Sequence, residues 1–448
     1  MAEYDTHQVN LGLSAKLWKH LSLNAFTEGF DCIAGGVRYE CTLCIRRFIL
    51  LAALTGLAGN MRAQLAEKLE AAGMENVKAV RTEQGWVASF EDRLYRSSYE
   101  GVGKAVEAAL ACETAGQETV LVVTDENGIP VLRIGLPGEV AESYRAGNCG
   151  LKEVFGAMTL DTETDEALKA LKGTETRNRS SWKPDLCVYP QVFLENTSFD
   201  KLYRYSISLA PALEMPLWKG AELTAQVIFP IVGNQQGELK QIRPGVVALK
   251  QGFYWKRNWR TTIEAGLLTN HRMGGQVKAS WRNRDGRWEL GVRLGLTVYS
   301  LIDNQGWTVT NRPKVNAGVY ARAYIPVWNT EVTVEGNRFV YGDYGVKGDL
   351  TRHFGEYTVG LYGIYTGGMV NGGFSFAIPL PGRKYKRWKG NAGETGGLFL
   401  IHLQHGGLGR IHRPEPGKGL PDTARGKPQQ GFYQPDFIKD FLIKHTNN

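Results

Sequence analysis

The stretch from Trp288 to Tyr299 limits most narrowly what this chain can fold into. Its side chains alternate at every residue, as the two faces of an extended strand do. One face is wholly apolar, whereas the other carries charges, glycines and a threonine: Trp288, Leu290, Val292, Leu294, Leu296 and Val298 stand against Glu289, Gly291, Arg293, Gly295 and Thr297. Strands of soluble sandwiches are seldom so long with so consistently charged a second face. The pattern therefore favours a transmembrane β-barrel strand, apolar toward lipid and polar toward the lumen.

The same alternation recurs along residues 185–380. Clear further examples are the runs 260–267, 276–282 and 316–325. About twelve runs of roughly ten residues can be counted, and ten residues is about the length that a tilted strand needs to cross a bilayer. We therefore predict a mainly β fold with an antiparallel transmembrane β-barrel of about twelve strands over 185–380.

The links between these runs fall into two classes that alternate along the chain. After every second run the link is a tight turn, and these turns lie at 216–220, 256–258, 283–286, 326–329 and 353–356. The intervening links are looser and polar, as at 233–243 and 300–314. Outer-membrane barrels have short periplasmic turns and longer outer loops, so both ends of the barrel segment are expected in the periplasm.

Five tryptophans lie in or beside the tight turns: Trp218, Trp255, Trp259, Trp288 and Trp328. Ordinary core packing would explain any one of them. Their clustering at alternate turns favours an aromatic girdle at the membrane interface.

Composition and charge narrow the class of protein less than the pattern does. Hydrophobic residues make up 43% and charged residues 22% of the 448 residues, and the mean hydropathy is −0.28. These values exclude a bundle of membrane-spanning helices without excluding a barrel, whose strands are only half apolar. The net charge of +8 indicates acidic partners such as lipid headgroups, polyanionic sugars or nucleic acid, and an outer-membrane location would exclude nucleic acid.

The N-terminal region does not fit a simple order of domains. Residues 1–43 alternate around a tight turn after Trp18, like the closing strands of another barrel. Residues 44–63 resemble a signal peptide, with Arg46 and Arg47 before an apolar run, although Met61 fits the small-residue cleavage rule poorly. A signal should not lie inside a chain, so our hypothesis is a misassigned start or a fused upstream frame over 1–43. The alternative is a helix over 46–57 buried in a soluble domain.

Residues 64–160 have the pattern of a small soluble α/β domain. A helix followed by two strands occurs twice, with strands over 77–81 and 86–90 and then over 119–123 and 129–134. Asn127 and Gly128 form a strong hairpin signal between the second pair. The αββαββ order predicts a ferredoxin-like sandwich in the periplasm, and the polar segment 161–184 is expected to link it to the barrel.

The remaining C-terminal segment, 381–448, is basic and rich in Gly and Pro, and we expect it to be a mostly disordered periplasmic tail with a short amphipathic stretch over 437–444. Its basic run at 383–388 is either a solvated turn or a contact for polyanions or lipid headgroups. His402, His405 and His412 lack a carboxylate or thiolate cluster, so no metal site is expected. His353 lies at a turn without an evident serine and acidic partner, so a hydrolase triad is not expected either.

Cysteine usage allows little structural inference. Cys32, Cys41 and Cys44 would be lost with the signal segment, and Cys112, Cys149 and Cys187 would remain. Three cysteines permit at most one internal bridge, and its pairing cannot be deduced.

Short motifs in two regions carry a resemblance to a known family. In the α/β region they are 65–69, 73–77, Glu-Asp-Arg-Leu-Tyr-Arg at 91–96 and Asn-Gly-Ile-Pro at 127–130, and at the barrel end they are 357–362 and 373–380. Over roughly 65–380 the chain resembles the YjbH family of exopolysaccharide and group 4 capsule proteins. The resemblance implies an outer-membrane barrel that works with polysaccharide export machinery, without known catalytic residues. Family members are longer and often lipoproteins, so the chain could be a whole unit or half of one that a partner completes.

Charged residues on the predicted lumen face are the candidates for function. They are Arg204, Glu222, Arg260, Glu264, Lys278, Arg282, Glu289, Arg293, Arg322, Glu335 and Asp349. Twelve strands enclose a narrow lumen, so these charges either pair across a filled interior or line a small channel that favours acidic sugars. We expect a non-enzymatic component of exopolysaccharide or capsule export, without a cofactor, in contact with outer-membrane lipid, export proteins and acidic polysaccharide. The alternatives are a diffusion channel for acidic oligosaccharides and a barrel enzyme.

Overall fold

The computed structural model describes residues 2–5, 8–18, 21–28, 32–39, 64–112, 116–195, 204–234, 240–269, 271–378, 384–387, 400–403, 407–408 and 432–446. The chain divides into two compact units, 1–61 and 62–448. In the described part of the chain, no helix combines the length and the apolar character that crossing a bilayer requires.

The first unit is a four-stranded antiparallel sheet in chain order, so the alternating runs of this segment are strands. Its strands are β1 (Ala2–Asp5), β2 (Gln8–Trp18), β3 (Leu21–Glu28) and β4 (Cys32–Tyr39). Trp18 pairs with Leu21 at the tight turn that the sequence predicted. The signal-like segment 44–63 lies outside the described residues, and the origin of 1–43 stays a hypothesis.

The second unit starts with the α/β module, which we define as residues 64–170. After a helix over 64–71 come β5 (Glu75–Arg81), β6 (Trp86–Glu91), α2 (Ser98–Leu110), β7 (Glu118–Asp125), β8 (Ile129–Pro137), α3 (Gly138–Arg145), α4 (Leu151–Ala157), β9 (Thr159–Asp161) and α5 (Asp165–Ala170). The predicted hairpin is present, because Asp125 pairs with Ile129 across a three-residue loop in which Asn127 and Gly128 have positive φ of 58° and 94°. Leu69, Phe90 and Leu132 are fully buried in the core between helices and sheet.

The topology of the α/β module differs from the ferredoxin-like sandwich that the sequence predicted. The sheet order is β5-β6-β7-β8-β9, and β6 pairs directly with β7 in parallel, with Val87 opposite Val120. A ferredoxin-like fold places another strand between the parallel strands of each βαβ unit, whereas here α2 crosses over between neighbours. The αββαββ order was right, but spacing alone could not distinguish these two pairings. The result is a small mixed sheet.

The predicted barrel segment forms one large sheet with twelve long strands. They are β10 (Asp185–Glu195), β11 (Arg204–Pro216), β12 (Ala221–Gly233), β13 (Arg243–Trp255), β14 (Trp259–Thr269), β15 (Arg272–Arg282), β16 (Trp288–Asp303), β18 (Lys314–Ile325), β19 (Thr330–Arg338), β20 (Tyr344–Phe354), β21 (Tyr357–Thr366) and β22 (Met369–Ala377). Each pairs antiparallel with the next along the chain. Four shorter strands join them: β17 (Gly306–Val309), β23 (Lys386–Arg387), β24 (Leu400–Leu403) and β25 (Gly407–Leu408).

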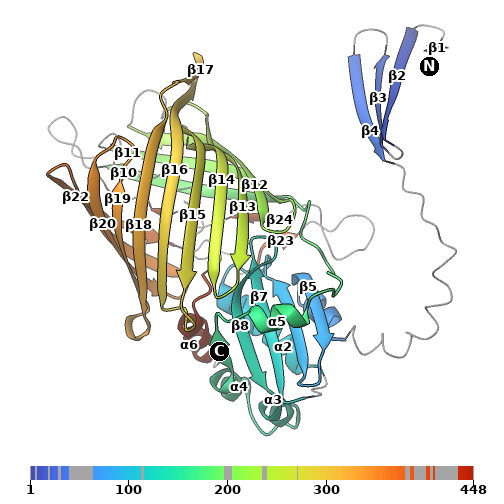
Figure 1. The fold of residues 1–448 in the computed structure, drawn as a ribbon, viewed down its shortest axis with the longest axis vertical. Coiled ribbons are helices and arrows are strands. Elements are labelled where there is room, and N and C mark those ends of the chain that lie inside the picture. The colour runs from blue at the N-terminus through green and yellow to red at the C-terminus, as the bar shows by residue number, and fades with distance from the viewer. Residues whose placement is uncertain are drawn as a thin grey trace. The chain divides into compact units, whose positions relative to one another are not determined.

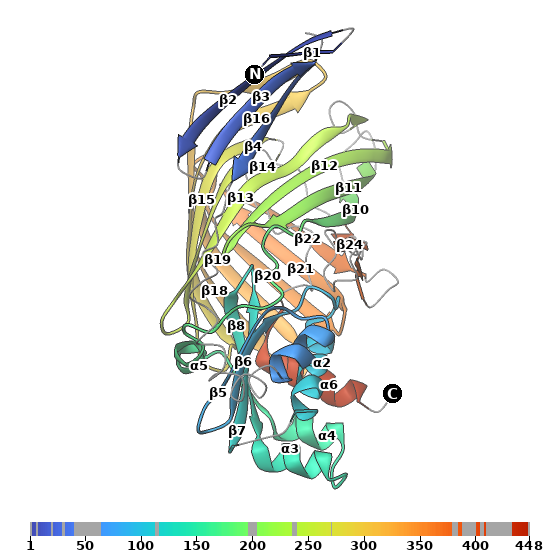
Figure 2. The same ribbon diagram turned by 90° about the vertical axis from the view of Figure 1, so that its right-hand side faces the viewer.

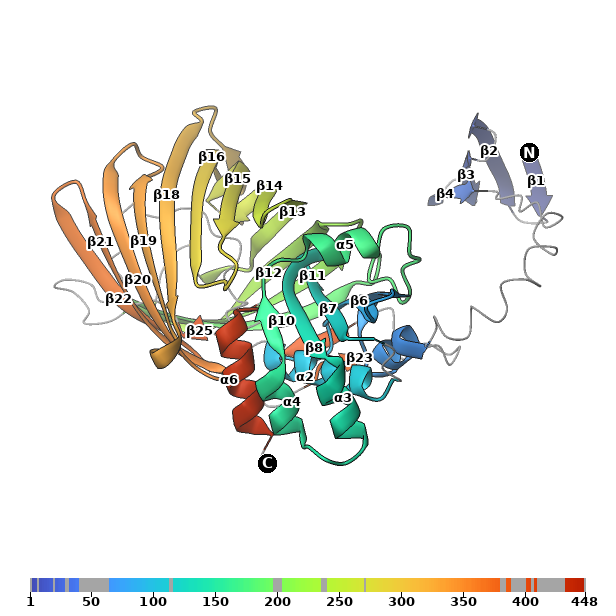
Figure 3. The same cartoon turned by 60° about the horizontal axis from the view of Figure 1, so that its bottom comes forward.

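The large sheet is strongly curved, as Figure 3 shows, but a closed barrel is not established. In the described residues, β22 and β10 are connected only through the two residues of β25. Leu408 in β25 faces Phe376 of β22 on one side and Val192 of β10 on the other. The predicted antiparallel sheet is therefore confirmed, whereas the barrel remains a proposal.

The five tight turns lie where the sequence predicted them, between β11 and β12, β13 and β14, β15 and β16, β18 and β19, and β20 and β21. The loops at the other end are less uniform than expected. The 233–243 link is long, and the 300–314 link contains the hairpin of β16 with β17. By contrast, Thr269 pairs with Arg272, and Gly367 and Gly368 alone join β21 to β22 with φ of 54° and 76°.

The two faces of the large sheet have the chemistry that the alternation predicted. Along β16 the outward residues are about half exposed, from 49% at Leu290 to 58% at Leu294, whereas the intervening Glu289 is 5% exposed. Similar exposed apolar residues occur on β11, β13, β18 and β21. The outward face is therefore apolar, and the inward face carries the charges.

The C-terminal segment contributes a helix that the sequence only partly predicted. α6 (Pro435–His445) starts two residues before the expected amphipathic stretch, with Pro435 in its first turn and the Gln434 side chain accepting a hydrogen bond from the Phe437 amide at 2.6 Å. It packs beside α2 and α4, as Figure 2 shows for α2. Residues 409–431 lie outside the described residues.

Candidate functional site: the turn junction and the charged inner face

The α/β module and α6 together contact all five tight turns of the large sheet. Figure 1 shows the module below the turn ends of β13–β16. The first contact is a pair of hydrogen bonds, in which Asn127 Nδ2 donates to the Trp218 carbonyl and the Gly220 amide donates to the Asn127 carbonyl at 3.1 Å. The tip of the β7–β8 hairpin is thereby fixed to the turn between β11 and β12. We call this whole contact region the turn junction.

The buried side chain of Glu91, at the end of β6, forms hydrogen bonds to the tip of that hairpin. Its carboxylate accepts hydrogen bonds from the Asn127 amide at 3.2 Å, the Gly128 amide at 3.1 Å and Asn76 Nδ2 at 2.6 Å. Burial raises the pKa of Glu91 to about 7, even though Arg93 and these donors act in the opposite direction. A buried acid therefore fixes the hairpin that contacts the sheet.

Arg93 connects the module to the first strands of the sheet. Its guanidinium donates to Asp185 Oδ2 at 2.7 Å, lies 3.2 Å from Glu91 and reaches to 3.8 Å from Glu222 on β12. The Arg93 and Asp185 side chains are both more than nine-tenths buried. A buried cation shared by three carboxylates is costly to disrupt, because removing it would leave buried negative charges unpaired.

The rest of the 91–96 motif reaches the last hairpin of the sheet. Asp92 Oδ1 accepts from the amides of Leu94 and Tyr95 at 3.0 Å, which sets the bend. Arg96 and Ser97 then both contact the Glu356 carboxylate in the turn between β20 and β21. The motif 91–96 and Ser97 therefore contact both the first strands of the large sheet and the turn between two of its last long strands.

The segment 161–184, which the sequence predicted to be a linker, contacts the middle turns. Thr162 accepts a hydrogen bond from Asn258 at 2.8 Å, and its amide donates to the Arg284 carbonyl at 2.9 Å. Asp165, in the first turn of α5, accepts from the Arg257 amide at 3.0 Å. Two further tight turns are therefore fixed by polar contacts with this segment.

Helix α6 completes the turn junction on the side of β16, β18 and β19. Asp436 forms two hydrogen bonds to Arg287, at 2.8 and 3.0 Å, and Asp440 accepts from Asn329 at 3.3 Å. Burial would raise the pKa of Asp436, but the hydrogen bonds from Arg287 and Gln434 lower it below its usual value. Phe437, which is 2% exposed, packs against Phe432 and Phe441 with ring centroids 5.0 and 4.6 Å away.

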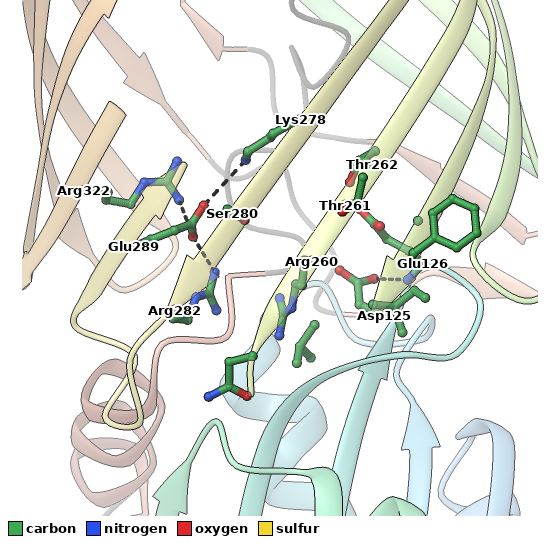
Figure 4. A pocket seen from close by; sticks show the side chains of 15 residues that line it. Asp125, Glu126, Arg260, Thr261, Thr262, Lys278, Ser280, Arg282, Glu289 and Arg322 are labelled. Carbon is green, nitrogen blue, oxygen red and sulfur yellow. Dashed lines mark hydrogen bonds and ion pairs between the residues drawn. The ribbon is translucent and has the colours of Figure 1, made fainter. Parts of the chain in front are cut away.

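The charged inner face is organised around Glu289 on β16. Arg282, Lys278 and Arg322 approach its carboxylate at 3.0, 3.7 and 3.8 Å, and the Tyr320 hydroxyl donates to it at 2.7 Å. Figure 4 shows this cluster, in which Lys278 and Arg282 from β15 and Arg322 from β18 are directed at one carboxylate on the strand between them. Antiparallel pairing brings them together, since Arg282 faces Glu289 and Glu289 faces Arg322 in the register.

Most other predicted lumen residues also lie in polar contacts on this inner face. Arg293 lies 3.5 Å from Glu335, Lys347 lies 2.6 Å from Asp349, and Gln276 donates to Glu264. Arg322 also lies 3.5 Å from Glu331, which is 3.1 Å from His353 Nε2. Arg204 is the first residue of β11, and its side chain lies outside the described residues. Sequence reasoning missed Glu331 and Tyr320, although both sit at inward positions of the alternation.

Arg260 differs from the other inner-face cations. Its Nη2 donates to the Pro130 carbonyl of β8 at 2.8 Å, and its buried Nε has no hydrogen-bond partner. Beside it is a cavity of about 230 Å³, bounded by the β7–β8 hairpin and by residues of β13, β14, β15, β16 and β18. Arg260, Lys278, Arg282 and Arg322 line this cavity with Asp125, Glu126 and Glu289.

The five tryptophans lie where the girdle hypothesis needs them. All are at the turn end of the sheet and between 47% and 60% exposed: Trp218, Trp255, Trp259, Trp288 and Trp328. These exposed fractions are too large for residues packed in a core, which was the alternative explanation for each tryptophan.

The described residues contain neither a disulfide nor a metal-binding cluster. In this part of the chain, Cys112, Cys149 and Cys187 form no disulfide. Within the described ranges, no three metal-ligating side chains come together in a group that could hold a metal ion, and His405 and His412 lie outside those ranges.

Comparison with known proteins identifies the family. The YjbH family model, described as exopolysaccharide biosynthesis protein YbjH, matches residues 3–375. The chain belongs to the YjbH exopolysaccharide biosynthesis family. This match covers nearly all of the first unit, the α/β module and the large sheet as far as residue 375 in β22, so at the N-terminal end the YjbH resemblance extends further than the motifs that first indicated it. No curated protein and no solved structure matches the chain.

Proposed function

We propose that this YjbH family member is a non-enzymatic outer-membrane component of exopolysaccharide or capsule export, in which the large sheet forms a transmembrane barrel. The observation that best supports this proposal is the difference between the two faces of the sheet. In a strand such as β16, apolar side chains point outward and charged side chains point inward. Family membership supports a part in exopolysaccharide biosynthesis. The location and the lack of catalysis are our inference.

Surface chemistry supports the membrane location. Monomeric soluble proteins rarely expose contiguous apolar patches larger than a few hundred Å². Here long apolar side chains are exposed on one face of successive strands, for example Leu249, Leu294 and Leu361 at 38%, 58% and 57%. Strands of 11 residues such as β14 and β15 would span roughly 25–30 Å when tilted as in a barrel, which matches the apolar band of an outer membrane.

Aromatic residues at both ends of the strands support the same location. The five tryptophans occupy the turn end, and a second set is exposed at the loop end: Tyr205, Trp307, Tyr341, Tyr344 and Tyr365. Two aromatic belts that flank an apolar band are typical of membrane barrels, since these rings prefer the headgroup level. The turn end would then face the periplasm, with the α/β module and α6 beneath it.

The inner-face geometry supports a role without catalysis. The charges on β15, β16 and β18 take part in ion pairs, since Lys278, Arg282 and Arg322 all contact Glu289. Reactive sites usually contain a nucleophile beside a base or a metal, whereas the described charges of this face engage one another in ion pairs. The α/β module would act as a dock for other export proteins in the periplasm, and its fold by itself specifies no chemistry.

A small channel for acidic oligosaccharides is the second candidate. The observation in its favour is the cavity beside Arg260, which has four cationic and three acidic lining residues. The contacts of the α/β module with all five turns count against free diffusion through that end. Single-channel recording in planar bilayers would decide, since a barrel sealed by the α/β module should give silent bilayers.

Deletion of the gene with complementation tests the main proposal. We expect loss of surface polysaccharide, recovery with the wild-type gene, and recovery of the protein in the outer-membrane fraction after separation from the inner membrane. Normal polysaccharide in the deletion strain would refute the role in export. A protein that stays dissolved without detergent would refute the membrane location.

A further inference from the structure

The cavity beside Arg260 has the features of a binding site for an anion. It lies between the β7–β8 hairpin and the inner face of the sheet, away from the apolar outer face. Its volume of about 230 Å³ holds one sugar ring or several waters, and not a folded peptide. Figure 4 shows Arg260, Lys278 and Arg282 around this space.

The charge balance of the cavity leaves a cationic excess. Its lining holds four cations and three carboxylates, and one of those carboxylates, Glu126, is paired at 2.5 Å with Lys250, which is not part of the lining. Lys278, Arg282 and Arg322 all form their ion pairs with the one carboxylate of Glu289, and Arg322 also pairs with Glu331. Cations held this close together repel one another, so a further anion would be favoured here.

Arg260 is the cation with the least compensation. Among the described residues it has no ion pair, and its one hydrogen bond goes to a neutral carbonyl, that of Pro130. Its Nε is buried without a partner, although a buried guanidinium donor left unsatisfied costs free energy. The Pro130 contact fixes one side of the guanidinium, which orients the remaining donors before any ligand arrives.

The ligand chemistry follows from these groups. A guanidinium binds a carboxylate through two parallel hydrogen bonds, a geometry that lysine cannot reproduce. Thr262 and Ser280 also line the cavity and can exchange hydrogen bonds with sugar hydroxyls. We infer that this cavity binds a carboxylate-bearing sugar unit of an acidic polysaccharide, with Arg260 holding the carboxylate and Lys278 adding charge. This rests on the proposed function, because the inner face must meet the polymer.

Calorimetric titration of the purified full chain in detergent tests the site directly. The probes are a defined oligogalacturonate, a neutral malto-oligosaccharide of the same length, and sodium sulfate. We expect binding of oligogalacturonate that weakens as salt increases, and much weaker binding of the other two probes. Equal binding of sulfate, or of the neutral sugar, would overturn the assignment of a carboxylated sugar.

Substitutions of Arg260 test whether this residue binds the carboxylate. Arg260→Gln should weaken oligogalacturonate binding roughly 10- to 100-fold, the range for one charged hydrogen-bonded contact. Arg260→Lys keeps the charge without the two-pronged geometry and should fall in between. Arg284→Gln is the matched control, because that side chain is 70% exposed at a tight turn and should leave affinity unchanged. An Arg260→Gln protein that keeps the wild-type circular dichroism and binds equally well would overturn the inference.

The proposed export role can fail separately. Loss of polysaccharide on gene deletion, together with no sugar binding in the titration, would refute the site and leave the export role standing. Sugar binding by a protein whose deletion leaves polysaccharide unchanged would do the reverse.

Discussion

A single charge on the outward face of β16 tests the membrane location most sharply. Leu294 is 58% exposed and lies between Val277 of β15 and Ala317 of β18. It is six residues from Trp288 at the turn end, which corresponds to roughly 15 Å of depth for a strand tilted by about 40°. Leu294 would therefore lie near the middle of the apolar band.

The expected cost of Leu294→Arg depends strongly on what surrounds that side chain. In lipid, an arginine at the midplane of a barrel costs about 2–4 kcal/mol, or roughly 30- to 1,000-fold in the folding equilibrium. In water, a substitution at a half-exposed position usually changes stability by about 0.5 kcal/mol or less. The two environments thus predict effects that do not overlap.

The assay is reversible folding into phosphatidylcholine vesicles, followed by tryptophan fluorescence and by gel mobility over a denaturant titration. Val327→Arg is the control, because Val327 is 86% exposed in the turn between β18 and β19 and should cost about 0–1 kcal/mol. If Leu294→Arg proved as mild as Val327→Arg, the outward face would not lie in hydrocarbon, and the membrane location would be refuted.

Three further predictions concern the turn junction. Burial raises the pKa of Glu91 to about 7, so the protonated acid stabilises the fold fully below pH of about 4.5 and this contribution is lost as pH rises through 7. Denaturant titrations should therefore show a more stable α/β module at pH 5 than at pH 8, and Glu91→Gln should reduce that difference; an unchanged pH dependence would contradict this role. Arg96→Ala should cost about 3 kcal/mol and speed proteolysis of the module, because it removes the cation that pairs with the largely buried Glu356 carboxylate. Lys104→Ala removes only an exposed pair and should change little. Phe437→Ala should cost about 3–5 kcal/mol, since that ring is 2% exposed among other rings, whereas Lys444→Ala on the exposed side of α6 is the control; thermal unfolding would measure both, and equal effects would mean that α6 does not brace the turns.

The large sheet could be predicted from sequence because its signal is local. Each inward or outward position is fixed by the residue's own place in an alternating run, so the five turns and residues such as Glu289 and Arg293 were placed correctly. Strand partners in the α/β module depend on a crossover, and the sequence order αββαββ permits more than one sheet order. That is why β6 and β7 were not recognised as direct neighbours.

The turn junction was missed for a different physical reason. Its contacts join residues that are far apart in the chain, such as Arg96 with Glu356 and Arg287 with Asp436. Each of these charges looks like an ordinary solvated residue when read in sequence, because no local pattern marks a charge that will be buried by another domain. The segment 161–184 looked like a linker because Thr162 and Asp165 are polar, yet these polar groups bond to the turns.

The junction also explains why motifs of the α/β module, alongside the two segments 357–362 and 373–380 at β21 and β22, carried the family resemblance. An outward strand position accepts any apolar residue, because lipid imposes no shape on it, so strand sequences can vary widely at constant pattern. Arg93 has no such freedom, since its guanidinium must meet Glu91 and Asp185 inside a buried space, and Asn127 must adopt a positive φ while bonding to Trp218. Residues that must satisfy several contacts at once, such as Arg93 and Asn127, are difficult to replace and therefore make a motif recognisable. The 91–96 and 127–130 motifs are therefore better explained by fixing the α/β module to both ends of the strand order than by any chemistry of their own.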